Sequence, residues 1–200
     1  MMMKTKRLKP KITITDLPPG FPKEKLRFAM TGRIYIGIDP GKTGFICVLS
    51  GNQIQFYPIP KIGKQVDLLE LSNIIEKYKD ANCHCVMEDV HAIYGSAAGA
   101  TFEFGRIVGS LETLLVAFRI SHTKVTPKKW QKEMWEGVSV QKKPSSSKKT
   151  MVTDTKKMSE VAAKRLFPDI DLRKSTRANN VDDNKVDSLL MAEYCRRNYD

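Results

Sequence analysis

Short stretches of alternating or continuous hydrophobic residues predict the strands of this protein. Ile34, Ile36 and Ile38 alternate with their neighbours, and this period of two is typical of a strand. Gly51-Asn52, between two further apolar runs, is a hairpin turn signal. The other predicted strands are residues 45–49, 54–59, 83–87 and 121–125.

Apolar residues three or four positions apart predict the helices. Residues 66–78 follow this pattern, and so do residues 101–118, with a Gly/Ala-rich loop at 91–99 before them. The remaining predicted helices are a short one beginning at Thr126-Pro127, residues 156–166 and about residues 182–197. Three strands followed by alternating helices and strands indicate an α/β protein with a mixed sheet and helices on its faces.

Two segments fall outside this pattern. Residues 1–32 are basic and interrupted by four prolines, which predicts a disordered N-terminal arm ahead of one domain at residues 33–200. Residues 138–155 are poor in apolar residues and rich in Ser and Lys, which predicts a mobile basic loop. We expect neither a membrane helix, for which about 20 consecutive apolar residues are needed, nor a secretory signal.

The 200 residues carry a formal net charge of +12, and most of the excess lies in two segments. Residues 1–33 hold nine Lys/Arg against two Asp/Glu, and residues 123–175 hold fourteen against six. Solubilising lysines would explain the first segment. The second lies within the folded part, where a basic region points to a polyanion such as nucleic acid.

The four cysteines lie in apolar or helical surroundings, which indicates free thiols in an intracellular, reducing compartment. We expect the cytoplasm or nucleoid of a cell, or the interior of a host cell if a virus encodes the chain. Cys83-His84-Cys85 has the ligand types of a zinc site but no second pair. Strand alternation would also point His84 away from both thiols.

Four carboxylates stand where apolar residues are expected. Asp39 and Glu88 end apolar strands, and Asp183 and Asp187 fall within the apolar arc of the last helix. Helix capping explains an acid at the first turn, but Asp187 lies beyond that turn. Bound cations would offset the mutual repulsion, and oxygen-only ligands favour Mg²⁺, or Mn²⁺ in its place. Two such ions beside basic segments would suit hydrolysis of a DNA phosphodiester.

Three motifs resemble a known family. Residues 35–41 (YIGIDPG), 86–92 (VMEDVHA) and 182–192 (DDNKVDSLLMA) resemble, in order and spacing, the acidic motifs of RuvC-type Holliday junction resolvases. These are RNase H-like nucleases, and the likeness is strongest to their phage and viral branch. Residues 102–105 (FEFG), 126–130 (TPKKW) and 165–168 (RLFP) add to it.

The resemblance implies an RNase H-like fold with a five-stranded mixed sheet flanked by helices. It also implies a Mg²⁺-dependent homodimer that cuts four-way DNA junctions symmetrically, in DNA recombination and repair. Asp39, Glu88 and Asp187 would be metal ligands. The fourth position is Asp183 at a spacing of four residues, or Asn184 at a spacing of three. We choose Asp183, because a carboxylate binds Mg²⁺ better.

The resemblance further suggests residues that contact DNA. An aromatic in the loop after Glu88 would stack at the junction centre, and His91 and Tyr94 are candidates. An ordinary surface turn is the alternative. The candidate lysines are Lys129, Lys132, Lys156 and Lys157.

Three functions fit these residues. The first is a junction-selective endonuclease, and the second is a less selective RuvC-like nuclease acting on branched or replicative DNA. The third is an RNase H-like protein that binds DNA without cutting it, although a binder has no need of four inward carboxylates. The long helix at 101–118 has more apolar surface than one core stripe requires. Gly105 and Gly109 on it suit a dimer contact.

Overall fold

In the computed structural model, which describes residues 32–90, 97–145 and 149–199, the chain begins with an antiparallel meander. Its strands are β1 (Ile34–Ile38), β2 (Phe45–Ser50) and β3 (Gln53–Pro58). β1 is buried along its whole length, because helices cover both of its faces.

Two parallel strands extend the sheet on the other side of β1. β6 (Cys83–Glu88) pairs with β1, and β7 (Ser121–Val125) pairs with β6. The strand order is β3-β2-β1-β6-β7, so the predicted five-stranded mixed sheet is confirmed. The carboxyl ends of β1 and β6 meet at one edge, where Ile38 lies opposite Met87. Asp39 and Glu88 follow directly at that edge.

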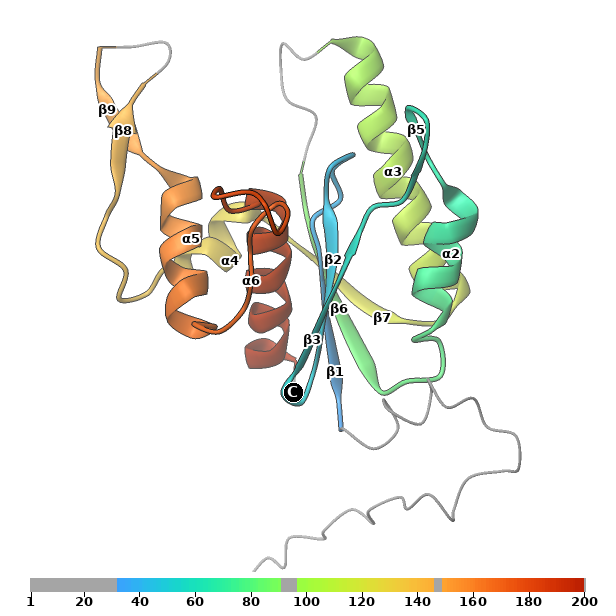
Figure 1. Cartoon of the computed structure of the whole chain (residues 1–200). Coiled ribbons are helices and arrows are strands. Elements are labelled where there is room, and N and C mark those ends of the chain that lie inside the picture. The colour runs from blue at the N-terminus through green and yellow to red at the C-terminus, as the bar shows by residue number, and fades with distance from the viewer. Residues whose placement is uncertain (1–31, 91–96, 146–148, 200) are drawn as a thin grey trace, which may run out of the picture.

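Helices form a layer on each face of the sheet (Figure 1). One face carries α2 (Leu68–Glu76) and α3 (Ala98–Ala117), packed over Ile36, Cys85 and Met87. The other carries α4 (Pro127–Met134), α5 (Thr155–Leu166) and α6 (Asp183–Asn198), and its core includes Trp130 and Tyr194. The predicted RNase H-like layering is therefore present.

Helix α6 crosses β1 with backbone against backbone. A Cβ atom at Gly37 would overlap the Ser188 carbonyl oxygen and the Ala192 amide nitrogen, so only glycine fits there. This close approach places the first turns of α6 against the carboxyl end of β1. It is the packing detail that brings Asp187 towards Asp39.

The structure adds elements that the sequence pattern missed. β4 (Lys61–Ile62) and β5 (Gln65–Val66) form a small ribbon before α2. Within the predicted mobile loop, β8 (Lys142–Pro144) and β9 (Met151–Thr153) pair as a second ribbon that projects beside α5 (Figure 1). Backbone pairing holds both ribbons together, and neither has the apolar periodicity from which a strand is predicted.

His84 lies on the opposite face of β6 from Cys83 and Cys85, as the alternation predicted. Its ring stacks on Tyr199 with centroids 4.1 Å apart, whereas the two thiols face α2 and α3. All four cysteines are free and buried. Among the described residues, no helix is both long enough and apolar enough to cross a membrane.

Candidate active site

Asp39 is held at the end of β1 by a tight turn. Its backbone amide donates to the Phe45 carbonyl oxygen at 3.0 Å, and its Oδ1 accepts from the Gly41 amide at 3.4 Å. A Cβ atom at Gly44 would overlap the Asp39 carbonyl oxygen, so the turn needs glycine there. Burial and the charge of Glu88 raise the pKa of Asp39 to about 7, against this hydrogen bond.

Glu88 is the last residue of β6, and α4 fixes its side chain. The indole Nε1–H of Trp130 donates to Glu88 Oε1 at 3.0 Å. Trp130 is itself fully buried, so it gives this carboxylate a rigid neutral partner. Burial raises the pKa of Glu88, although the Trp130 hydrogen bond acts in the opposite direction.

Asp187 faces the same edge from the second turn of α6. Its Oδ1 is buried and receives no hydrogen bond from the described residues. Burial raises its pKa to about 7, and the charges of Asp39, Glu88 and Asp183 add to the rise. The Ser159 hydroxyl on α5 interacts with the carboxylate and opposes that rise. A buried oxygen without a partner is costly unless a ligand binds it.

These three carboxylates therefore form one negative cluster, which we call the acidic centre: Asp39, Glu88 and Asp187. The charges of Asp39 and Glu88 raise the pKa of Asp187, and the charge of Glu88 raises the pKa of Asp39, so the three lie within electrostatic reach. As they stand, no three His, Cys, Asp or Glu side chains in the described ranges are close enough to hold a metal ion. The oxygen donors fit a hard divalent cation, but the ligand shell is not closed.

The start of α6 presents three polar residues that are used differently. Asp182 caps the helix and accepts from the Asn184 and Lys185 amides, and its charge also reaches Asp39. Asp183 Oδ2 accepts from Lys156 Nζ at 2.7 Å. The amide of Asn184 donates to the Thr43 carbonyl and hydroxyl oxygens at 2.9 and 3.0 Å. Asp183 thus lies beside Asp187, while Asn184 ties α6 to the turn after β1.

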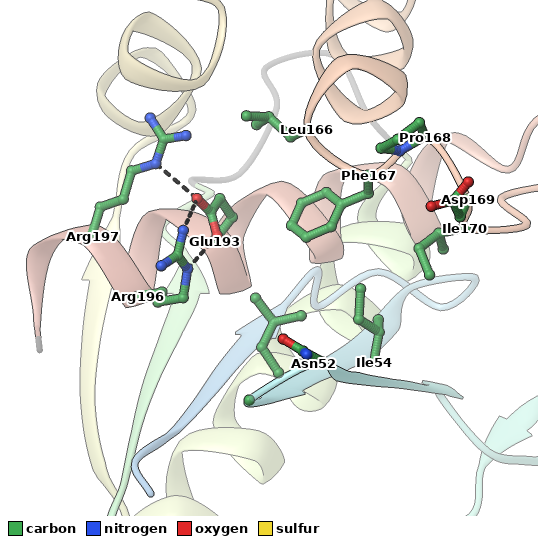
Figure 2. A pocket seen from close by; sticks show the side chains of 12 residues that line it. Asn52, Ile54, Leu166, Phe167, Pro168, Asp169, Ile170, Glu193, Arg196 and Arg197 are labelled. Atoms are coloured by element: carbon green, nitrogen blue, oxygen red, sulfur yellow. Dashed lines mark hydrogen bonds and ion pairs between the residues drawn. The ribbon is translucent and has the colours of Figure 1, made fainter. Parts of the chain in front are cut away.

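Glu193, further along α6, shows how this protein stabilises a buried carboxylate that needs no ligand. Its side chain is 3% exposed and accepts from Arg196 and Arg197 at 2.7 to 2.9 Å (Figure 2). Burial would raise the pKa of Glu193, but the two arginines more than offset this, and the pKa falls. Among the described residues, no Arg or Lys forms an ion pair with Asp187 on the same helix, which sets the acidic centre apart.

A cavity of about 630 Å³ lies at this far end of α6, between the β2–β3 turn and the residues after α5 (Figure 2). Phe167 and Ile170 form part of its apolar wall. None of the acidic centre lines it, so the cavity and the carboxylates are separate features.

The predicted DNA-contacting residues are spread over several places. Of the four lysines, Lys156 lies beside the acidic centre, where the hydrogen bond and charge of Asp183 raise its pKa. Lys157 pairs with Glu160 at 2.9 Å, and Lys129 interacts with Tyr194. Lys132 is exposed on the last turn of α4. His91 and Tyr94 lie outside the described residues.

No family model matches this chain, and no curated protein does. The yeast mitochondrial Holliday junction resolvase Ydc2 matches with a TM-score of 0.50 at 16% identity, over 81% of this chain and 77% of Ydc2. The chain has a RuvC-type resolvase fold.

Two structures of RuvC from Thermus thermophilus match as well. The one in complex with a Holliday junction substrate has a TM-score of 0.48 at 12% identity, covering 83% of this chain and 96% of RuvC. The other has a TM-score of 0.44 at 14% identity, covering 82% and 96%. Neither of these two proteins is viral, so the phage and viral branch stays a prediction.

Within the RuvC-type fold, the acidic centre sits where strand ends and a helix start converge. Sequence reasoning placed Asp39, Glu88 and Asp187 there, but it assigned no role to Trp130 or Ser159. The signal for Trp130 was present in the sequence, because Trp130 and Met134 are the two large apolar side chains of α4 and their spacing of four residues puts both on its buried face. Ser159 carries no sequence signal, since its contact depends on how α5 packs against α6.

Proposed function

We propose that this chain is a divalent-metal-dependent DNA endonuclease that resolves four-way junctions. The observation that carries the proposal is the acidic centre, whose Asp187 Oδ1 accepts no hydrogen bond from the described part of the chain, at the edge of a RuvC-type sheet. Ydc2, a Holliday junction resolvase, has this fold. The surface lysines of residues 123–175 suit a polyanionic substrate.

The residues present fit Mg²⁺ in their chemistry. Asp39, Glu88 and Asp187 offer oxygen donors, and their mutual repulsion would be relieved by a cation. Mn²⁺ can take the same ligands. When bound, the metal would lower the pKa of a water and stabilise the leaving oxygen of a phosphodiester. Asp183 is our choice for the fourth ligand, because its charge reaches Asp187, one helical turn further along α6.

The chain's own residues would hold the DNA around this centre. Lys156 is placed to meet a phosphate next to the carboxylates, because its ammonium group already lies at that edge. Exposed lysines on α4 and on the β8–β9 ribbon would contact the backbone of a DNA arm. These contacts position DNA without reading its sequence.

The experiment compares three substrates: a synthetic four-way junction, a Y-fork and a linear duplex. Each is incubated with Mg²⁺, with Mn²⁺ or with EDTA. We expect paired cuts in the junction, weaker cutting of the fork, and none in EDTA. Equal cutting of linear duplex would favour the less selective nuclease. Junction binding without cutting in any metal would favour the non-catalytic DNA-binding protein.

Variants test the assignment of the acidic centre. Asp39→Asn and Asp187→Asn should lower cleavage by at least about 100-fold, since each removes a charge that holds the cation. Asp67→Asn is the matched control. Asp67 caps α2 on the other side of the sheet, and asparagine caps a helix equally well. Unchanged cleavage by Asp187→Asn would contradict the assignment.

We also propose that the chain is a homodimer that meets a second copy through α3. A hollow of about 430 Å³ lies along this helix, lined in part by Gly105, Arg106 and Gly109. A Cβ atom at either glycine would meet nothing within 4 Å. Phe102 is 71% exposed on the same helix, and a large exposed apolar side chain suits an interface. A two-fold dimer would match a two-fold junction.

Sedimentation tests this contact. Gly109→Arg should shift the protein from dimer to monomer, because the added side chain fills the hollow without touching the protomer's own core. Lys61→Arg, on the exposed β4 strand, is the control and should leave the dimer intact. A dimer that persists in Gly109→Arg would exclude α3 as the interface.

A further inference from the structure

The two tryptophans of this chain are both placed on or beside α4, five residues apart. Trp130 lies within the helix, and Trp135 is its C-terminal cap residue. Each indole donates its N–H towards a carboxylate of the acidic centre, one directly and one through a serine. Nothing in the predicted catalytic set explains why both should point there.

Trp130 acts on Glu88. Its Nε1–H lies 3.0 Å from Glu88 Oε1, and the ring is fully buried, so it cannot turn away without opening the core. An indole nitrogen donates and never accepts. It therefore stabilises the ionised carboxylate, and it occupies Oε1 while leaving Oε2 for another ligand.

Trp135 acts on Asp187 through Ser159. The Trp135 Nε1–H donates to Ser159 Oγ at 3.3 Å. This leaves the hydroxyl hydrogen of Ser159, which is 3% exposed, free to face the Asp187 carboxylate, whose pKa it lowers. The other oxygen, Oδ1, receives no hydrogen bond from the described residues. Asp187 thus has a neutral partner in Ser159, and its Oδ1 is left for another ligand.

Both anchors are neutral, and this distinguishes them from the arginines on Glu193. A cation on Glu88 or Asp187 would cancel the charge that attracts a metal, whereas an indole or a hydroxyl leaves that charge in place. We propose that Trp130 and the Trp135–Ser159 pair are positioning residues, which aim one oxygen each of Glu88 and Asp187 at a shared divalent cation. The inference rests on the proposed function, because it assumes that the acidic centre binds metal.

The test observes the two indole N–H groups directly by NMR. With two tryptophans, the ¹⁵N–¹H spectrum has two indole signals, which Trp130→Phe and Trp135→Phe assign. On titration with Mg²⁺ in the absence of DNA, the Trp130 signal should shift saturably. The shift should be lost in Glu88→Gln. Ser159→Ala should weaken Mg²⁺ binding about 10- to 100-fold, and Ser159→Thr, which keeps the hydroxyl, should restore part of the loss.

Ser188→Ala is the matched control. Ser188 is a buried serine next to Asp187, but its hydroxyl donates to Lys185 within α6, so Mg²⁺ affinity should not change. If the protein cuts DNA with Mg²⁺ while the indole signals stay unmoved and Ser159→Ala binds Mg²⁺ normally, the positioning role is overturned and the nuclease stands. If the indoles respond and no DNA is cut, the positioning role stands and the nuclease proposal fails. If neither occurs, both fail.

Discussion

Lys156 Nζ lies 2.7 Å from Asp183 Oδ2, so a lysine cation already occupies one oxygen beside the acidic centre. The pair joins the first turn of α5 to the first turn of α6. The charge of Lys156 also interacts with the charge of Asp187. In metal-free protein, the Lys156 ammonium group thus partly takes the place of a metal ion. With metal and DNA bound, the same lysine is placed to turn to a phosphate.

Lys156→Gln should therefore change metal and DNA binding in opposite directions. Without the competing ammonium group, Mn²⁺ should bind the DNA-free protein about two- to five-fold more tightly, the range expected for one exposed ion pair. Junction binding should weaken, and its slope against log salt should fall by about 1. Calorimetry measures the first and fluorescence anisotropy the second.

Lys164→Gln serves as the comparison for this change. Lys164 lies on the same helix and pairs with Glu160, away from the carboxylates. Lys164→Gln should change neither Mn²⁺ affinity nor junction binding appreciably. If Lys156→Gln weakened Mn²⁺ binding, the lysine would be holding Asp183 in place rather than competing for it.

Asp187→Asn should stabilise the metal-free protein. The substitution removes a buried charge that repels Asp39 and Glu88, and we expect the free energy of unfolding in EDTA at pH 7.5 to rise by about 1–3 kcal/mol. Mg²⁺ should raise the melting temperature of the wild type and not of the variant. Calorimetry with Asp67→Asn alongside checks both effects. A variant less stable than wild type in EDTA would mean that Asp187 has an unrecognised structural partner.

Burial, together with this repulsion, sets a pH dependence. Asp39 and Asp187 have folded-state pKa values of about 7, against 3.8 for an ordinary Asp, so between these values the folded state holds more protons than the unfolded state. Their contribution to stability is present below about pH 4 and is lost as the pH rises to about 7. Urea unfolding in EDTA at pH 5 and pH 7.5 should show wild type losing more stability than Asp39→Asn/Asp187→Asn. Equal losses would contradict the raised pKa values.

The fold and part of the site could be predicted because they depend on local patterns. The alternation of apolar residues predicted β1. The helical period placed Asp187 on the buried arc of the last helix, where burying its charge is energetically costly. The order of strands and helices then indicated which strand ends would meet. The β8–β9 ribbon could not be found in this way, because lysines and serines with no apolar face form it.

The anchors of the carboxylates were beyond sequence reasoning for a different reason. Trp130 meets Glu88 across 42 positions of chain, and Ser159 meets Asp187 between two helices whose packing no local pattern specifies. Glu193 also sits on the buried side of α6. Its pairing with Arg196 and Arg197 follows the helical spacing of three and four residues, so these two ion pairs could have been predicted from the sequence.

Two residues at the start of α6, Asp183 and Asn184, are the candidates for the fourth metal ligand. Asp183→Asn should lower Mn²⁺ affinity and cleavage by about tenfold or more, because it removes a charge that reaches Asp187. Asn184→Ala should leave Mn²⁺ affinity within about twofold, since the Asn184 amide is committed to Thr43. The free energy of unfolding of Asn184→Ala, measured by thermal melting, should instead fall by about 1 kcal/mol. The reverse ranking of metal affinities would assign the position to Asn184.

Gly37→Ala tests the packing that assembles the site. The added methyl group would overlap the α6 backbone at Ser188 and Ala192, neither of which can turn away as a side chain could. We expect a loss of about 3 kcal/mol or more in the free energy of unfolding, measured by urea. Molecules that still fold must hold α6 further from β1, which moves Asp187 away from Asp39 and should lower Mg²⁺ affinity. Gly99→Ala, in the first turn of α3 with open space around it, should keep or slightly raise stability. A Gly37→Ala protein as stable as wild type would mean that the backbones of α6 and β1 do not touch.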